Sequence, residues 1–298
     1  MYLLRPFLLY LHSNSHIMKR RKTSMKIPPV IKFTAKILEK ISPKLALKFG
    51  LALFYKPIRF SRPKREEAFY NLANKDFFTL RGRNIRTYEW LHGEKKVLLV
   101  HGWSGRGTQM NKIIEAFTKE NYSVYSFDAP AHGESEGKTT HMYEFVDSIM
   151  EMEKKFGMFN LIIGHSMGGV ATLNAVNRGV QTPRVAIIGT PNLIRNVISD
   201  FCMNINFSDK MIPLIVGYIE KRYGENIDSV SSENVGNKID IPILVIHDEN
   251  DVDVQYSEAL TIKSKVKKAE LFTTKRLGHR LVLANDGVVK KILEFSEL

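Results

Sequence analysis

Short apolar segments alternate with longer amphipathic ones from residue 76 to the C-terminus. The stretches between the short segments, such as 142–156, carry apolar residues at helical spacing. A segment at 77–90 alternates around Gly82, as the two strands of a hairpin do. This order of strand and helix predicts an α/β fold, with a mostly parallel central sheet covered by helices on both faces. The expected parallel strands lie at 97–100, 123–127, 161–163, 185–189, 243–247 and 269–273.

One long insertion interrupts this order. The 50 residues of 191–240 show no strong strand pattern, and 193–201 and 210–224 are predicted to be helical. Insertions of this length in compact domains usually carry function, often as a lid over a site. We therefore expect a helical lid at 191–240, within a domain that spans 66–298.

The basic residues concentrate in an N-terminal extension, residues 1–65. The extension holds 16 Lys and Arg and one acid, whereas 66–298 holds 28 Lys and Arg against 30 acids, so the net charge of +13 belongs to the extension. Apolar residues recur at helical spacing over 30–41, and Pro43 separates them from a second apolar segment at 45–55. The first helix also carries lysines on another face: Lys32, Lys36 and Lys40.

Two interpretations of this extension stay open. In the first, its helices pack on the body of the protein and the lysines are solvated. In the second, residues 1–65 form a basic amphipathic anchor that makes peripheral contact with an anionic membrane surface. The segment 45–55 is too short to span a membrane, which takes about 20 residues. The basic cluster after the first apolar run argues against a signal peptide, and Met18 or Met25 is an alternative start to Met1.

Composition narrows the classes of function. A single cysteine, Cys202, excludes an intrachain disulfide and fits a cytoplasmic location, with the membrane surface as the alternative. The nine histidines lack the spacing of metal ligands, so we expect neither metal nor cofactor. No nucleic-acid-binding motif accompanies the charge, and no nucleic-acid partner is expected. The sequence does not indicate an oligomeric state.

Two segments match G-x-S-x-G, the pattern of the nucleophile elbow in serine hydrolases: 133–137, centred on Ser135, and 164–168, centred on Ser166. The elbow requires a strand before the serine and a helix after it. Ser166 has both, since "NLII" precedes it and "GGVATLNAV" follows it. Ser135 follows a loop rich in turn-forming residues, so we expect it to cap the next segment or to face solvent. Ser166 is therefore the predicted nucleophile.

Five motifs in order make the chain from about residue 76 onward resemble the α/β-hydrolase superfamily. "GHSMGG" is similar to the elbow of the monoglyceride-lipase, carboxylesterase and serine-aminopeptidase branches. The resemblance implies the α/β-hydrolase fold with a helical lid. The other four segments are "LLVHGWSG", similar to the oxyanion loop; "FDAPAHGES", similar to an Asp-x-Pro-Gly-His-Gly-x-Ser loop; "ILVIHDENDVDV", similar to the acid strand; and "TKRLGHRLVL", similar to the histidine loop.

The resemblance assigns roles to single residues. His279 is the expected general base, and Asp251 is the expected acid that orients it, with Asp253 as the second candidate and Asp248 less favoured. The backbone N–H groups of Trp103 and Met167 are expected to form the oxyanion hole. The histidines at 101, 132 and 165 are expected to be structural or to line the site.

These residues predict a serine hydrolase that cleaves a carboxylic ester, of small-molecule or lipid type, through an acyl-enzyme. Other reactions of the same triad are the alternative: acyl transfer, thioester cleavage or aminopeptidase-type amide hydrolysis. A non-catalytic binding protein with the same fold is the third hypothesis.

Overall fold

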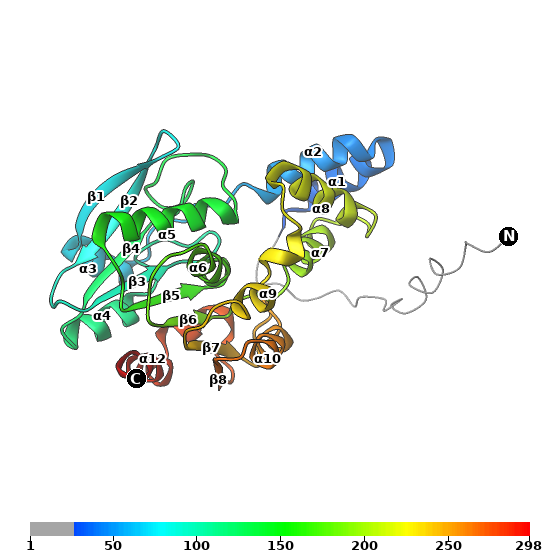
Figure 1. The fold of residues 1–298 in the computed structure, drawn as a ribbon. Coiled ribbons are helices and arrows are strands. Elements are labelled where there is room, and N and C mark those ends of the chain that lie inside the picture. The colour runs from blue at the N-terminus through cyan, green and yellow to red at the C-terminus, as the bar shows by residue number, and fades with distance from the viewer. Residues whose placement is uncertain (1–26) are drawn as a thin grey trace.

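A computed structural model describes residues 27–298, so the questions of the signal peptide and of the start at Met1, Met18 or Met25 concern residues outside this range. A sheet of eight strands lies at the centre of the described chain, in the order β1-β2-β4-β3-β5-β6-β7-β8 (Figure 1). β2 is antiparallel to β1 and β4, and the other neighbours are parallel, which confirms the predicted hairpin and the mostly parallel sheet. The strands are β1 (Asn74–Leu80), β2 (Arg83–Trp90), β3 (Lys96–Val100), β4 (Ser123–Phe127), β5 (Leu161–His165), β6 (Val185–Ile188), β7 (Ile243–Asp248) and β8 (Ala269–Thr274).

Successive residues of the central strands pack against opposite layers of helices, because side chains alternate between the two faces of a strand. Val97 and Leu99 of β3 pack with α4 and α12, whereas Leu98 and Val100 pack with α5 and α6. One layer contains α4 (Asn111–Lys119) and α12 (Asp286–Glu297), and the other contains α5 (Met142–Phe156), α6 (Met167–Asn177) and α10 (Tyr256–Lys265). Shorter elements complete the body: α9 (Ser232–Gly236), α11 (Gly278–Leu281), η1 (Ile227–Val230) and η2 (Val282–Ala284).

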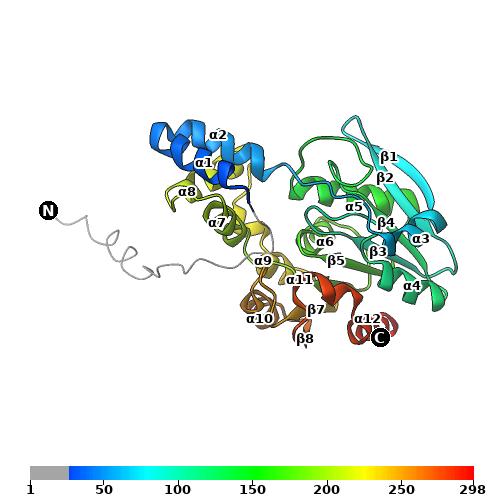
Figure 2. The same ribbon diagram turned by 180° about the vertical axis from the view of Figure 1, so that it is seen from behind.

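Four further helices gather at one end of the molecule, apart from the sheet (Figures 1 and 2). Two of them are the helices predicted in the insertion, and two come from the N-terminal extension. We call this group the four-helix layer; it consists of α1 (Pro29–Ile41), α2 (Pro43–Phe54), α7 (Ile194–Asn204) and α8 (Met211–Tyr223).

Contacts between α1–α2 and the insertion hold the four-helix layer together. The rings of Phe54 and Phe201 meet edge to face with centroids 5.1 Å apart. Phe207 packs so closely on Gly50 that a Cβ at that glycine would lie 2.7 Å from the phenylalanine ring. Glu39 accepts hydrogen bonds from the backbone N–H and the hydroxyl of Ser208. The described part of the extension thus packs on the rest of the protein through one of its faces.

A helix that the hydrophobic pattern does not predict, α3 (Lys64–Leu72), connects this layer to β1. Its buried position is occupied by Glu66, which is 2% exposed, accepts a hydrogen bond from Thr108 Oγ1 at 2.7 Å, and lies 3.7 Å from Arg106 Nε. A carboxylate with polar partners can be buried. Because the buried position is not apolar, the sequence shows no hydrophobic periodicity that would predict this helix.

Candidate active site

Ser166 occupies the turn between β5 and α6. Its backbone has φ 54° and ψ −122°, a conformation that costs free energy for a residue with a side chain. Its N–H donates to the carbonyl of Ile188 at 2.8 Å, which fixes the turn against β6. The strand, strained turn and helix are those that the sequence predicts around this serine.

The loop after β3 lies directly beside Ser166. A Cβ added to Gly102 would be 2.8 Å from the Cβ of Ser166. On the other side, a Cβ at Gly168 would be 2.3 Å from the carbonyl oxygen of Val100 and 2.5 Å from that of His101, so only glycine lets α6 approach β3 this closely. The predicted oxyanion residues, Trp103 and Met167, therefore lie on two neighbouring segments.

Buried polar groups hold this loop. The N–H of Ser104 donates to Nε2 of His132 at 2.9 Å, and the N–H of Gly107 donates to Oδ1 of Asp128 at 2.7 Å. Burial, followed by the proximity of His101, lowers the pKa of His132 well below its usual value. A neutral imidazole can accept at Nε2 while Nδ1–H donates to the carbonyl of Pro130 at 3.0 Å. These contacts fix the path of the backbone next to the nucleophile candidate.

Asp251 and His279 form a hydrogen-bonded pair, with 2.7 Å between Oδ2 and Nδ1. The second carboxylate oxygen of Asp251 accepts from the N–H groups of Asp253 at 2.8 Å and Val254 at 2.9 Å. Asp251 is 7% exposed. The structure thus brings His279 to Asp251, while Asp253 contributes a backbone N–H that orients the same carboxylate.

The imidazole of His279 lies beside that of His165, the residue before Ser166. Nε2 of His165 is 2.9 Å from the carbonyl oxygen of His279, and the two rings have centroids 4.7 Å apart. A Cβ at Gly189, the residue after Ile188, would be 3.1 Å from Nδ1 of His279. The predicted nucleophile, base and acid therefore gather at the carboxyl ends of β5, β6 and β7.

The sequence and the fold were compared with those of known proteins. The family model of serine aminopeptidase, S33, matches residues 91–202. Among solved structures, a protein of Acinetobacter baumannii provisionally named a lipase aligns with a TM-score of 0.60 and 15% identity, over 79% of this chain and 96% of its own. An esterase from Exiguobacterium antarcticum aligns with a TM-score of 0.59 and 13% identity, over 74% of this chain and 98% of its own.

The chain has the α/β-hydrolase fold. In sequence, the chain is 28% identical over 95 residues to a protein of Mycoplasma genitalium provisionally named an esterase/lipase. The match covers 30% of this chain and 35% of that relative, so it spans about a third of the relative's length.

Asp248, the less favoured candidate for the acid, does not contact His279 through its carboxylate but orders the loop that precedes it. Its carboxylate accepts from the hydroxyl of Thr274 at 2.8 Å and from the N–H groups of Asn250 and Leu277 at 2.9 and 3.0 Å. Burial raises the pKa of Asp248, but hydrogen bonds from the backbone of Gly278, from Thr274 and from other backbone N–H groups outweigh it and lower the pKa overall. The ionised carboxylate thus ties the segment before His279 to the end of β7.

Ser135, the centre of the other G-x-S-x-G match, is fully buried, so the expectation that it caps a segment or faces solvent is wrong. Its hydroxyl donates to the carbonyl of Asp128 at 2.5 Å and accepts from the N–H of Arg86 at 2.9 Å. The hydroxyl is used to join the loop after β4 to β2.

Arg59 holds the same loop from outside, a role that the sequence does not reveal. Its guanidinium donates to the carbonyls of Ala131 at 2.9 Å, Ser135 at 2.5 Å and Gly137 at 3.1 Å. One residue earlier, the N–H of Ile58 donates to Oγ of Ser104 at 3.0 Å. The connection from α2 to α3 therefore runs along the rim of the candidate site. Arg59 lies in a basic stretch with no motif that would distinguish it from solvated arginines.

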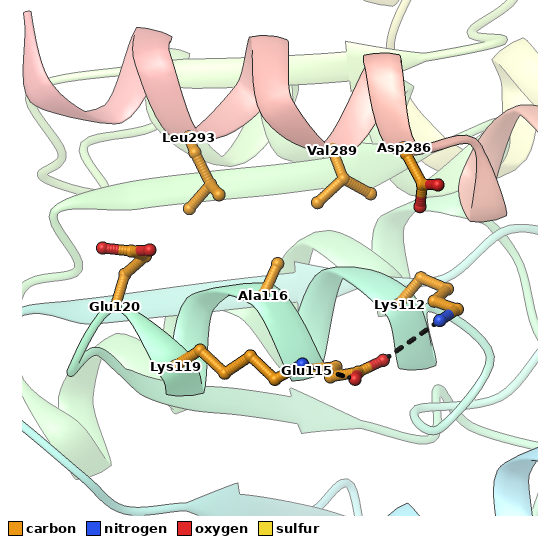
Figure 3. A pocket seen from close by; sticks show the side chains of 8 residues that line it. All are labelled: Lys112, Glu115, Ala116, Lys119, Glu120, Asp286, Val289 and Leu293. Carbon is orange, nitrogen blue, oxygen red and sulfur yellow. Dashed lines mark hydrogen bonds and ion pairs between the residues drawn. The ribbon is translucent and has the colours of Figure 1, made fainter.

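A shallow hollow lies between α4 and α12 (Figure 3). Its rim carries the ion pairs of Glu115 with Lys112 and Lys119, and Val289 and Leu293 form its apolar wall. None of its lining residues belongs to the segments that carry Ser166, Asp251 or His279. Within residues 27–298, no group of three or more His, Cys, Asp and Glu side chains is placed to hold a metal ion.

Proposed function

We propose that this protein is a serine hydrolase that cleaves a carboxylic ester through an acyl-enzyme. The observation that carries the proposal is the hydrogen bond between Asp251 and His279, in the neighbourhood of Ser166 on its strained turn. A serine hydroxyl is a weak nucleophile at neutral pH and needs such a base. The aspartate holds the imidazole in the tautomer that can accept a proton at Nε2.

The proposed reaction has two halves. Ser166 Oγ attacks the carbonyl carbon of the ester and its proton passes to Nε2 of His279, whose positive charge Asp251 stabilises. The carbonyl re-forms, the bond to the alcohol oxygen breaks, and the alcohol leaves with the proton from Nε2. Water then attacks the acyl-enzyme and gives a proton to His279. The carboxylic acid leaves as Ser166 Oγ takes that proton back.

The oxyanion is proposed to bind two backbone N–H groups, of Met167 and Trp103. Met167 is the first residue of α6, and the first N–H groups of a helix have no partner within it. Trp103 follows Gly102, which lies next to Ser166. Donors fixed by the backbone need no rearrangement when negative charge develops.

The ester class is supported by the names of the relatives, which include esterases and proteins provisionally named lipases. Trp103 and Met167 both pack against the core cluster that also contains residues of α7 and α8. We therefore propose that the insertion 191–240 acts as a lid and that the acyl group lies between it and the elbow.

A covalent probe tests the proposal. A fluorophosphonate should label the folded protein, and a heat-denatured sample should stay unlabelled, because only the assembled site activates the serine. An ester, a thioester and an amino-acid anilide with matched leaving groups then separate the reactions, and we expect the largest kcat/KM for the ester. Absence of labelling in the folded protein would support the binding-protein hypothesis instead.

Replacing Gly189 by alanine should lower kcat by about 10²-fold, the cost of a displacement of about 1 Å in a catalytic group. The added Cβ would lie 3.1 Å from Nδ1 of His279 and 3.4 Å from Oδ2 of Asp251, and would move the pair. Gly82→Ala is the matched control, because Gly82 also has a positive φ, of 73°, but nothing lies within 4 Å of its Cβ position. Steady-state kinetics and thermal unfolding compare the two, and equal kcat values would contradict the prediction.

A further inference from the structure

The helix α1 carries an apolar stripe on its solvent-facing side. Val30, Phe33, Ile37 and Ile41 are 67%, 68%, 41% and 69% exposed. At 3.6 residues per turn these four positions fall within about 80° of the helix circumference. Four large apolar side chains on one exposed stripe form a contiguous patch of the kind that marks an interaction surface.

The stripe is not needed to pack α1 in the fold. The helix already packs in the core through other side chains, with Ala35 fully buried and Ile31 and Leu38 partly buried. Its acid, Glu39, is bound to Ser208 of the insertion. Within residues 27–298, the exposed fractions show that no segment covers the stripe.

Positive charge lies along one side of this stripe. At 100° per residue, Lys36 and Lys40 lie along one side of it, on the arc next to Phe33. Glu39 is the acid between residues 27 and 65, and its hydrogen bonds with Ser208 direct it toward the insertion. We define the docking surface as the apolar stripe Val30, Phe33, Ile37 and Ile41 together with the two exposed lysines beside it, Lys36 and Lys40.

We propose that the docking surface binds the surface of a bilayer that contains anionic lipids, with α1 lying in the interface. An exposed apolar stripe bordered by lysines matches the apolar and anionic layers that such an interface presents together. A protein partner with an apolar groove would account for the apolar stripe but not for the lysines beside it. Of the helices in residues 27–298, none has the length and apolar character to cross a bilayer, so the proposed contact is peripheral.

The position of α1 in the fold determines which part of the protein would lie near the membrane. α1 and α2 lie with α7 and α8 at one end of the molecule, whereas α3 and α4 lie at the far end (Figures 1 and 2). A protein docked through α1 therefore holds the insertion 191–240 near the lipid. This inference goes beyond the proposed function and does not depend on it.

Vesicle sedimentation tests the surface with the full-length protein. We expect binding to vesicles of phosphatidylcholine with phosphatidylserine, weaker binding to phosphatidylcholine alone, and release by salt. Phe33→Ser with Ile41→Ser should weaken binding by at least about tenfold, since both side chains would leave the interface. Lys36→Gln with Lys40→Gln should weaken binding to the anionic vesicles and reduce its dependence on salt.

Matched pairs of changes elsewhere control for exposure and charge. Leu72→Ser with Leu91→Ser removes apolar side chains from residues that are 74% and 51% exposed on the body, and Lys154→Gln with Lys290→Gln removes charges there. Both control pairs should bind vesicles as the wild type does. Circular dichroism and hydrolysis of a water-soluble ester should be the same for all four pairs.

Three results would overturn the proposal. The first is a wild-type protein that does not bind anionic vesicles. The second is unchanged binding by both docking-surface pairs, which would put the contact elsewhere, residues 1–26 included. The third is no vesicle binding together with a particle mass that falls in the Phe33→Ser, Ile41→Ser protein, which would identify a second copy as the occupant. Binding retained in a protein without esterase activity would contradict the proposed function alone.

Discussion

Replacing Ser166 by alanine is expected to remove fluorophosphonate labelling and to lower ester turnover on the order of 10⁶-fold, the loss found when the nucleophile of such a triad is removed. The turn itself should survive, because alanine has the same Cβ and the N–H of Ser166 still donates to Ile188. Labelling followed by gel fluorescence, with kcat for a soluble ester, measures both effects.

Ser135→Ala is the control that the second G-x-S-x-G provides. This protein should label as the wild type does but unfold at lower temperature, because the N–H of Arg86 loses a buried acceptor, at a cost of about 1–3 kcal/mol. If Ser135→Ala abolished labelling in a folded protein while Ser166→Ala did not, the assignment of the nucleophile would be wrong.

Asp251→Asn is expected to lower kcat by about 10⁴-fold with the fold intact, because an amide can hold the imidazole in the wrong tautomer and cannot stabilise its cation. The hydrogen bond of 2.7 Å between Asp251 and His279 carries this expectation. Measuring kcat and KM separately with a soluble ester distinguishes lost turnover from lost binding of substrate, and the expected loss is in kcat.

The matched variant is Asp253→Asn, which keeps the backbone N–H that donates to Asp251. Its kcat should stay within about threefold of the wild type, less than about 1 kcal/mol in the barrier. A loss of about 10⁴-fold in Asp253→Asn with normal turnover in Asp251→Asn would exchange the two roles.

The pattern of the sequence predicts the sheet well because its central strands are buried on both faces. β3 and β7 contain the continuous apolar runs 97–100 and 243–246, which are typical of buried parallel strands. The turn at Ser166 is equally visible, since close approach of backbones requires the glycines around it. These features depend on residues that are close together in the sequence, so the sequence pattern reveals them.

Contacts between distant segments are not visible in this way. The hydrogen bonds of Arg59 join a basic linker to a loop more than 70 residues away, and nothing local marks that arginine. Ser135 can be buried because its hydroxyl makes hydrogen bonds with two backbone groups. The partners proposed for Ser166, which are His279 and Asp251, likewise follow from resemblance to a family, because their spacing in the sequence does not show that they meet.

The helices of the four-helix layer are separated in the sequence, which affects how the layer assembles during translation. α2 ends at Phe54, but its partners begin at Ile194 and end at Tyr223. At a synthesis rate of about 5–20 residues per second, α7 and α8 are complete roughly ten to thirty seconds after α2. During that time the inner faces of the two helices, with Ala46 and Leu51, stay exposed in addition to the outer stripe. Translation speed between residues 54 and 223 thus sets how long a chaperone or a membrane can compete for these helices before the layer closes.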